Sequence, residues 1–223
     1  RRRAAERRQR LAEAHAAEAA EWDQRRAQLW DGRPISLVRV LGELRDALGS
    51  RATVLARMPI GWPMAAWKFD RPSSYLGADG GGSVGSGPGM SVGAALAARE
   101  RGQVVVAVLG DGDLLMATSA LWIAANQRLP LLVIVANNQT YLNDEEHQEI
   151  VARHRGRPVE NRAVGQRMDD PPIDYAKIAR GLGVESRGPV SDTEQLRPAL
   201  DDAMRALDDG RPFLIDVRTG IIR

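Results

Sequence analysis

Two polar clusters in the sequence have side chains suited to binding a metal ion. One is Gly-Asp-Gly at positions 110–112, and the other is Asn-Asn at positions 137–138. Each cluster directly follows an apolar run of the kind that forms a buried strand. Because ligands of doubly wound sheets bind beyond the carboxyl ends of the strands, the two clusters are expected to lie side by side.

Asp111 and Asn138 carry the chemistry of this predicted site. Asp111 offers an anionic carboxylate oxygen and Asn138 a neutral amide oxygen. Mg²⁺ prefers oxygen ligands and takes few of them from protein, the rest coming from phosphates and water. Gly112 allows backbone N–H groups to approach a phosphate, and a helix beginning near Leu114 would point its positive end at that phosphate. The residues therefore predict a site for a metal ion and a diphosphate.

The elements that position these residues form a strand–helix–strand unit. Residues 104–109 and 131–136 are continuously apolar, as in strands covered on both faces. Residues 115–127 between them are apolar at helical spacing. The two strands should therefore pair in parallel through a right-handed crossover.

The rest of the chain continues the alternation of strands and helices. Residues 1–30 have a helix-forming composition, and Asp31-Gly32-Arg33-Pro34 ends that helix. Residues 139–172 are polar and have no assigned structure. Further helices are expected at 36–48, 90–99, 174–182 and 191–207, and further strands at 52–56 and 213–217.

This alternation predicts an α/β fold, with a doubly wound, mostly parallel sheet flanked by helices and preceded by an N-terminal helix. We expect six strands in the sheet. Residues 1–32 would be a helical tail or linker from a preceding domain, and residues 33–223 would form the ligand-binding domain. Because the chain begins at Arg1, we expect it to be part of a longer polypeptide.

The composition limits the classes of protein to consider. The chain has 223 residues, is 43% hydrophobic and lacks cysteine, so it can form a sizeable core but no disulfide and no thiolate nucleophile. We expect no membrane span, because no run of 18 apolar residues exists. A formal net charge of +2 does not indicate a nucleic-acid partner. We predict a cytoplasmic location.

The spacing of Asp111 and Asn138, each after an apolar strand, resembles the signature of enzymes that depend on thiamine diphosphate (ThDP). The stretch from Ser119-Ala120-Leu121-Trp122 to Asn137-Asn138-Gln139-Thr140-Tyr141 is similar to relatives of benzoylformate decarboxylase and acetolactate synthase. The resemblance implies that Asp111, the Asn138 side chain and the Thr140 carbonyl coordinate Mg²⁺. It also implies that the cofactor contacts Gly110, Gly112, Asp113 and Tyr141.

Asp113 departs from the pattern of this family, which often has a small hydroxyl residue at that position. The resemblance places Gly112 and Asp113 against the diphosphate, where a carboxylate is electrostatically unfavourable. The stretch Gly82-Ser83-Val84-Gly85 resembles the segment that grips the aminopyrimidine ring. By this resemblance the Gly82 carbonyl accepts a hydrogen bond from the 4′-amino group, and Val84 supports the bent cofactor.

The resemblance also implies a partner for this chain. Family members activate the aminopyrimidine with a Glu from a pyrimidine-binding domain of the same or another subunit, in a homodimer or homotetramer. Glu145 and Glu146 lie in the variable loop after the metal motif and are not expected to replace that residue. His147, in the same loop, could relay protons, although a surface histidine is the simpler interpretation.

The expected activity is ThDP- and Mg²⁺-dependent decarboxylation of a small 2-oxo acid with carboligation, as in acetolactate synthase. The long polar loop at 142–167 favours this over the alternative, a benzoylformate-type decarboxylase. A non-catalytic or regulatory ThDP-binding subunit is an alternative of another class. Residues 80–85 also match the dinucleotide-binding pattern G-x-G-x-x-G, but they do not directly follow an apolar strand as that fingerprint requires.

Overall fold

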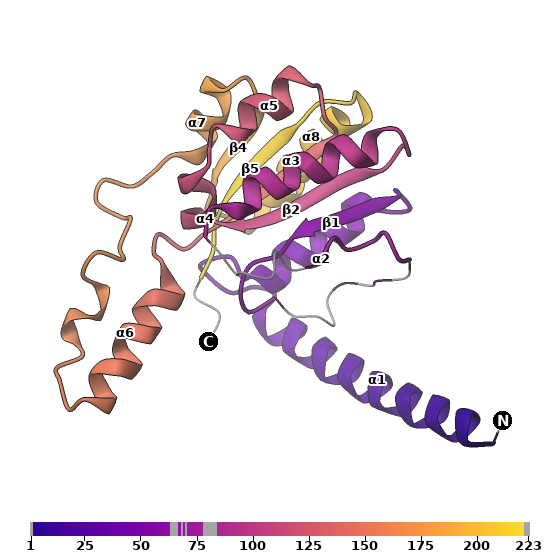
Figure 1. The fold of residues 1–223 in the computed structure, drawn as a ribbon, viewed down its shortest axis with the longest axis horizontal. Helices are drawn as coiled ribbons and strands as arrows, with labels where there is room; N and C mark the ends of the chain where they lie inside the picture. Colours follow the sequence, from indigo (N-terminus) through magenta and orange to yellow (C-terminus); the bar gives the residue numbers. More distant parts are fainter. Residues whose placement is uncertain (1, 63–66, 68, 70, 78–83, 221–223) are drawn as a thin grey trace.

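The computed structural model describes residues 2–62, 67, 69, 71–77 and 84–220. Its centre is a sheet of five strands in the order β1-β2-β3-β5-β4, and every neighbouring pair is parallel (Figure 1). The strands are β1 (Thr53–Arg57), β2 (Val104–Gly110), β3 (Leu131–Asn137), β4 (Glu185–Val190) and β5 (Phe213–Arg218).

Helices cover both faces of the sheet. Side chains alternate between the faces along each strand, so consecutive residues of a strand belong to different apolar clusters. Ile134 of β3 belongs to the apolar cluster with α2 (Leu37–Leu48) and α8 (Thr193–Asp208). Its neighbour Val133 belongs to the cluster on the other face. That second cluster includes residues of α3 (Ser86–Arg99), α4 (Asp111–Met116), α5 (Ala120–Asn126) and α7 (Tyr175–Gly181). The predicted doubly wound α/β fold is confirmed.

Two parts of the chain project from this layered body (Figure 1). Helix α1 (Arg2–Leu29) extends away from the sheet beyond α2. Helix α6 (Leu142–His154) and the 3₁₀ helix η2 (Glu160–Ala163) extend on the other side, after the carboxyl end of β3. We call residues 142–167 the arm. The described helices include none that is both long and apolar enough to cross a membrane.

The expectation of six strands is wrong for the part of the chain that the structure describes, which contains five. At the outer edge of β1, Leu55 forms only an isolated bridge with Tyr75. Strand β4 was not predicted, because polar residues and Gly188-Pro189 interrupt its apolar pattern and most of its residues are exposed or half-buried.

The single helix expected at 115–127 is two helices, α4 and α5, and this changes how the site is built. Helix α4 begins at Asp111, three residues before the predicted start near Leu114, and ends at Met116. Ala117 has φ −143° and ψ 38°, which is not helical, so the chain turns before α5. The polar segment at 139–172 also contains a helix, α6, that its composition did not reveal.

Candidate metal and diphosphate site

Hydrogen bonds to Asp111 join the loops that follow β2 and β3. The Oδ2 atom of Asp111 accepts from the backbone N–H of Gln139 at 2.6 Å, and its Oδ1 atom accepts from the N–H of Gly112 at 3.0 Å. Gln139 has φ +60°, a left-handed conformation that turns the chain back toward Asp111. The two predicted clusters are therefore brought together by direct contact.

The carboxylate of Asp111 is buried without a cationic partner. Only 2% of the residue is exposed, and it forms no ion pair with any residue that the structure describes. Burial raises the pKa of Asp111 from 3.8 to about 6, although the N–H groups of Gly112 and Gln139 act in the opposite direction. A buried, uncompensated carboxylate is costly, so a cation bound to its remaining lone pairs would relieve that cost.

The two adjacent asparagines have different surroundings. Asn137 is part of the sheet: its Nδ2 donates to Asp216 at 2.8 Å, and its Oδ1 accepts from Arg218 at 3.0 Å, both on β5. The Oδ1 atom of Asn138 instead accepts from the backbone N–H of Thr140 at 3.1 Å. Asn138 and Thr140 thus lie on the same turn as Gln139, whose N–H group contacts Asp111.

This set of oxygens fits Mg²⁺ bound together with phosphates. It contains one carboxylate, one amide oxygen and the backbone of Thr140, which is 3% exposed. Among the described residues, neither this site nor any other contains three or more His, Asp or Glu side chains arranged to hold a metal, so protein side chains alone would not complete the coordination of the ion. Mg²⁺ is often held by one or two carboxylates plus substrate phosphates and water, so a site of this kind suits a diphosphate ligand.

Tyr141 packs directly against Gly112. A Cβ atom at Gly112 would lie 2.2 Å from Cε1 of the Tyr141 ring, so a larger residue would require the ring to move. The ring fills the side of Gly112 on which a side chain would project. Both residues were predicted to contact the cofactor, and the structure places them side by side. Whether they touch a diphosphate stays a prediction.

Asp113 is engaged with α3 and not with the Asp111 turn. Its Oδ1 atom accepts hydrogen bonds from the backbone N–H groups of Gly85 and Gly87, and its Oδ2 atom lies 3.6 Å from Nε of Arg57. Val84, which directly precedes Gly85, is 45% exposed. Gly82 lies outside the described residues, so its predicted contact with the aminopyrimidine stays a prediction.

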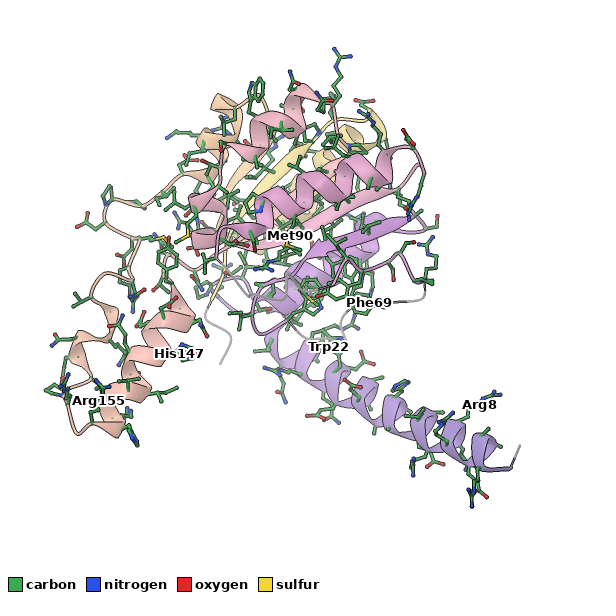
Figure 2. The ribbon with its side chains drawn as sticks, viewed as in Figure 1. Arg8, Trp22, Phe69, Met90, His147 and Arg155 are labelled. Atoms are coloured by element: carbon green, nitrogen blue, oxygen red, sulfur yellow. The ribbon has the colours of Figure 1, made fainter. Side chains whose placement is uncertain are left out.

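The arm carries a buried carboxylate that the sequence did not single out as structural. Glu145 is 4% exposed and accepts hydrogen bonds from Arg167 at 2.9 Å, Arg162 at 3.3 Å and the Thr140 hydroxyl at 3.1 Å. Its neighbour Glu146 is exposed. His147 is also exposed and lies on the projecting helix α6 (Figure 2). The partners of Glu145 are up to 22 residues away in sequence, and no local pattern predicts them.

Comparisons with known proteins match this chain to a family model and to curated relatives. Residues 59–217 match the family model described as thiamine pyrophosphate enzyme, C-terminal TPP binding domain. The chain is 33% identical over 201 residues to benzoylformate decarboxylase of Pseudomonas aeruginosa, which covers 85% of this chain and 35% of that enzyme. It is 30% identical over 190 residues to chloroplastic acetolactate synthase 2 of Brassica napus, which covers 82% of this chain and 28% of that protein.

A solved structure shows the same fold. The thiamine diphosphate-dependent 4-hydroxybenzoylformate decarboxylase of Rhodococcus jostii superposes with a TM-score of 0.70 at 27% identity, over 86% of this chain and 34% of that one. The chain thus spans about a third of the length of the relatives that it matches.

Proposed function

We propose that Asp111, Asn138 and Thr140 hold the Mg²⁺ that anchors the cofactor. The premise is that this chain belongs to the thiamine pyrophosphate (ThDP) enzyme family. The observation that carries the proposal is the buried carboxylate of Asp111, which lacks a cationic partner and contacts the turn at Asn138–Thr140. Gly110, Gly112 and Tyr141 would then lie beside the diphosphate.

Each residue has a distinct task in this proposal. Asp111 supplies the anionic ligand, Asn138 its amide oxygen and Thr140 its backbone carbonyl, as the family resemblance implies. The hydroxyl of Thr140 is already engaged by Glu145 at 3.1 Å, so the side chain fixes the turn while the carbonyl acts as ligand. When bound, ThDP supplies the carbanion chemistry, and the protein supplies binding, orientation and electrostatics.

The reaction we propose is decarboxylation of a small 2-oxo acid. Both groups of named relatives support it, since one comprises a benzoylformate decarboxylase and the other acetolactate synthases. The polar segment at 142–167 favours carboligation, in which the acyl unit passes to an acceptor. The identity of 33% with benzoylformate decarboxylase favours the alternative, in which a proton takes the place of the acceptor. Product analysis with benzoylformate and pyruvate separates the two.

Activity requires a Glu from a pyrimidine-binding domain of the same or another subunit in this proposal. Glu145 does not serve as a substitute, because its oxygens accept from Arg162, Arg167 and Thr140. We also propose residues 1–32 as the tail of a preceding domain, a homodimeric or homotetrameric assembly, and a cytoplasmic location. A regulatory, non-catalytic subunit would bind ThDP with Mg²⁺ but give no turnover after assembly.

Calorimetric titration of the chain with ThDP, with and without Mg²⁺, tests the metal site. Asp111→Asn removes the charge at nearly constant volume and should weaken Mg²⁺-dependent ThDP binding by about 100-fold or more, the scale expected for loss of a charged ligand. Asp144→Asn is the matched control, because Asp144 is an exposed acid on α6. Equal ThDP affinity in the chain and in Asp111→Asn would refute the metal assignment.

A further inference from the structure

The carboxylate of Asp113 lies at the N-terminus of α3. Its Oδ1 atom accepts hydrogen bonds from the backbone N–H groups of Gly85 at 2.6 Å and Gly87 at 3.2 Å. Gly85 is the N-cap residue of α3 and has no side chain that could accept from the N–H of Gly87. Asp113, in α4, therefore supplies the acceptor that an N-cap Ser, Thr or Asp normally provides within its own helix.

The charge of Asp113 is balanced within the same contact. Nε of Arg57, the last residue of β1, lies 3.6 Å from Oδ2 of Asp113, and the two side chains are 18% and 12% exposed. A pair this sheltered is screened by salt much less than a surface pair. Asp113 thus connects β1, α3 and α4 and needs no ligand to compensate its charge.

Two glycines allow α3 to begin directly against α4. A Cβ atom at Gly87 would lie 2.2 Å from Oδ2 of Asp113, and one at Gly85 would lie 3.0 Å from Cβ of Met116. Gly85 also has φ +92°, which residues with a side chain rarely adopt. The start of α3 is therefore built around the Asp113 carboxylate.

We propose that Asp113 is a positioning residue that fixes Val84 relative to the Mg²⁺–diphosphate site, and this proposal rests on the function proposed above. Val84 directly precedes Gly85, and Asp113 accepts a hydrogen bond from the backbone N–H of Gly85. Asp113 in turn directly follows Gly112. One carboxylate thus links the residue expected to support the aminopyrimidine to the residues expected to hold the diphosphate. It takes the place of the direct diphosphate contact expected from the family resemblance.

Two ligands distinguish this role when each is titrated with Mg²⁺ into the full chain. ThDP reaches both ends of the proposed site, whereas inorganic pyrophosphate carries only the diphosphate part. We expect Asp113→Ala to weaken ThDP binding about tenfold or more, the scale of a lost charge-assisted hydrogen bond, and pyrophosphate binding less than about twofold. Asp113→Asn retains an oxygen acceptor for the two glycine N–H groups and should restore part of the ThDP affinity.

Asp174→Ala is the matched control for the loss of a helix cap. Asp174 is the N-cap residue of α7, and its side chain accepts from the backbone N–H of Lys177 at 2.8 Å. Helix α7 packs on the same face of the sheet as α3. This variant should lose a comparable cap but keep the ThDP-to-pyrophosphate affinity ratio of the unaltered chain.

Amide hydrogen exchange in the ligand-free chain tests the contact itself. Asp113→Ala should increase the exchange rates of the Gly85 and Gly87 amides about tenfold or more, since each loses its acceptor. Unchanged exchange, or an equal loss of ThDP and pyrophosphate binding in both Asp113 variants, would overturn the proposal. If the unaltered chain binds neither ligand, the proposed function fails, whereas amide exchange still reports whether Asp113 holds α3.

Discussion

Asp111 at the strand ends and Glu145 in the arm are both buried carboxylates, but their surroundings are opposite. Asp111 is 2% exposed and accepts hydrogen bonds from the neutral N–H groups of Gly112 and Gln139. Glu145 is 4% exposed and pairs with Arg162 and Arg167. Burial raises the pKa of Asp111 to about 6. Burial would also raise the pKa of Glu145, but hydrogen bonds from Arg167, Thr140 and Arg162 lower it below its ordinary value.

Glu145 is a carboxylate that stabilises the fold through its ion pairs, whereas the charge of Asp111 has no cationic partner among the described residues. The fold itself compensates Glu145, so that residue has no electrostatic reason to bind a further cation. Asp111 carries an electrostatic cost in the metal-free chain, and a bound Mg²⁺ would remove it. A carboxylate of the second kind is therefore a candidate for a functional site.

The largest expected effect concerns the pH dependence of stability in the metal-free chain. Because the folded state binds the Asp111 proton more tightly than the unfolded state, the stability due to this group is highest below pH 3.8 and is lost as pH rises through about 6. Between these two pH values the free energy of unfolding should fall by about 3 kcal/mol because of Asp111. Urea unfolding at several pH values should show this loss relative to Asp111→Asn, and a constant difference between the two proteins would contradict it.

Glu145→Gln should have a smaller effect of the opposite sign, on the arm and on the adjoining Thr140. The loss of the negative charge that faces Arg162 and Arg167 should lower the free energy of local opening by about 1–3 kcal/mol. Hydrogen exchange of residues 142–167 measures this opening, with Glu146→Gln, an exposed acid on the same helix, as control. The lowered pKa means that the stabilisation exists above about pH 4.5 and is lost as pH falls through the folded value. Equal exchange in both variants would show that Glu145 does not hold the arm.

Salt should have the smallest effect, and of the two buried carboxylates it should affect only Glu145. The side chains of Arg162 and Arg167 are 34% and 44% exposed, so 1 M NaCl should weaken their pairs with Glu145 by less than about 1 kcal/mol. The pH-dependent loss assigned to Asp111 should persist in salt, because it comes from burial and not from a charged partner. Exchange of residues 142–167 and urea unfolding at both salt concentrations provide the measurements.

The sequence predicted the parts of the site that lie next to regular elements. Asp111 and Asn138 directly follow β2 and β3, and parallel strands bring their carboxyl ends to one edge of the sheet. The position of each residue next to its strand was therefore enough to predict that the two lie close together. The link from Asp113 to Gly85 and Gly87 was not predicted, because it joins residues at least 26 positions apart through a helix start that the sequence placed four residues too late.

The arm escaped prediction for a different reason. Of the residues of α6, all of which the structure describes, Glu145 alone is buried, so the helix lacks the apolar stripe by which amphipathic helices are recognised. Strand β4 alternates between exposed and half-buried positions and ends on one buried residue. Hydrophobic periodicity therefore predicted the strands with buried residues, including the edge strand β1, and missed α6 and β4, whose residues are mostly exposed or half-buried.

The strand order has a consequence for synthesis of the protein on the ribosome. Strand β5 is made after β1, β2, β3 and β4, yet it lies between β3 and β4 and pairs with both. Until Phe213 to Arg218 emerge, β3 has an unpaired edge, and Asn137 lacks both Asp216 and Arg218. A nascent chain that already contains every proposed metal ligand thus cannot complete the sheet that holds them. An edge of β3 left unpaired in this way is open to pairing with other chains until β5 emerges.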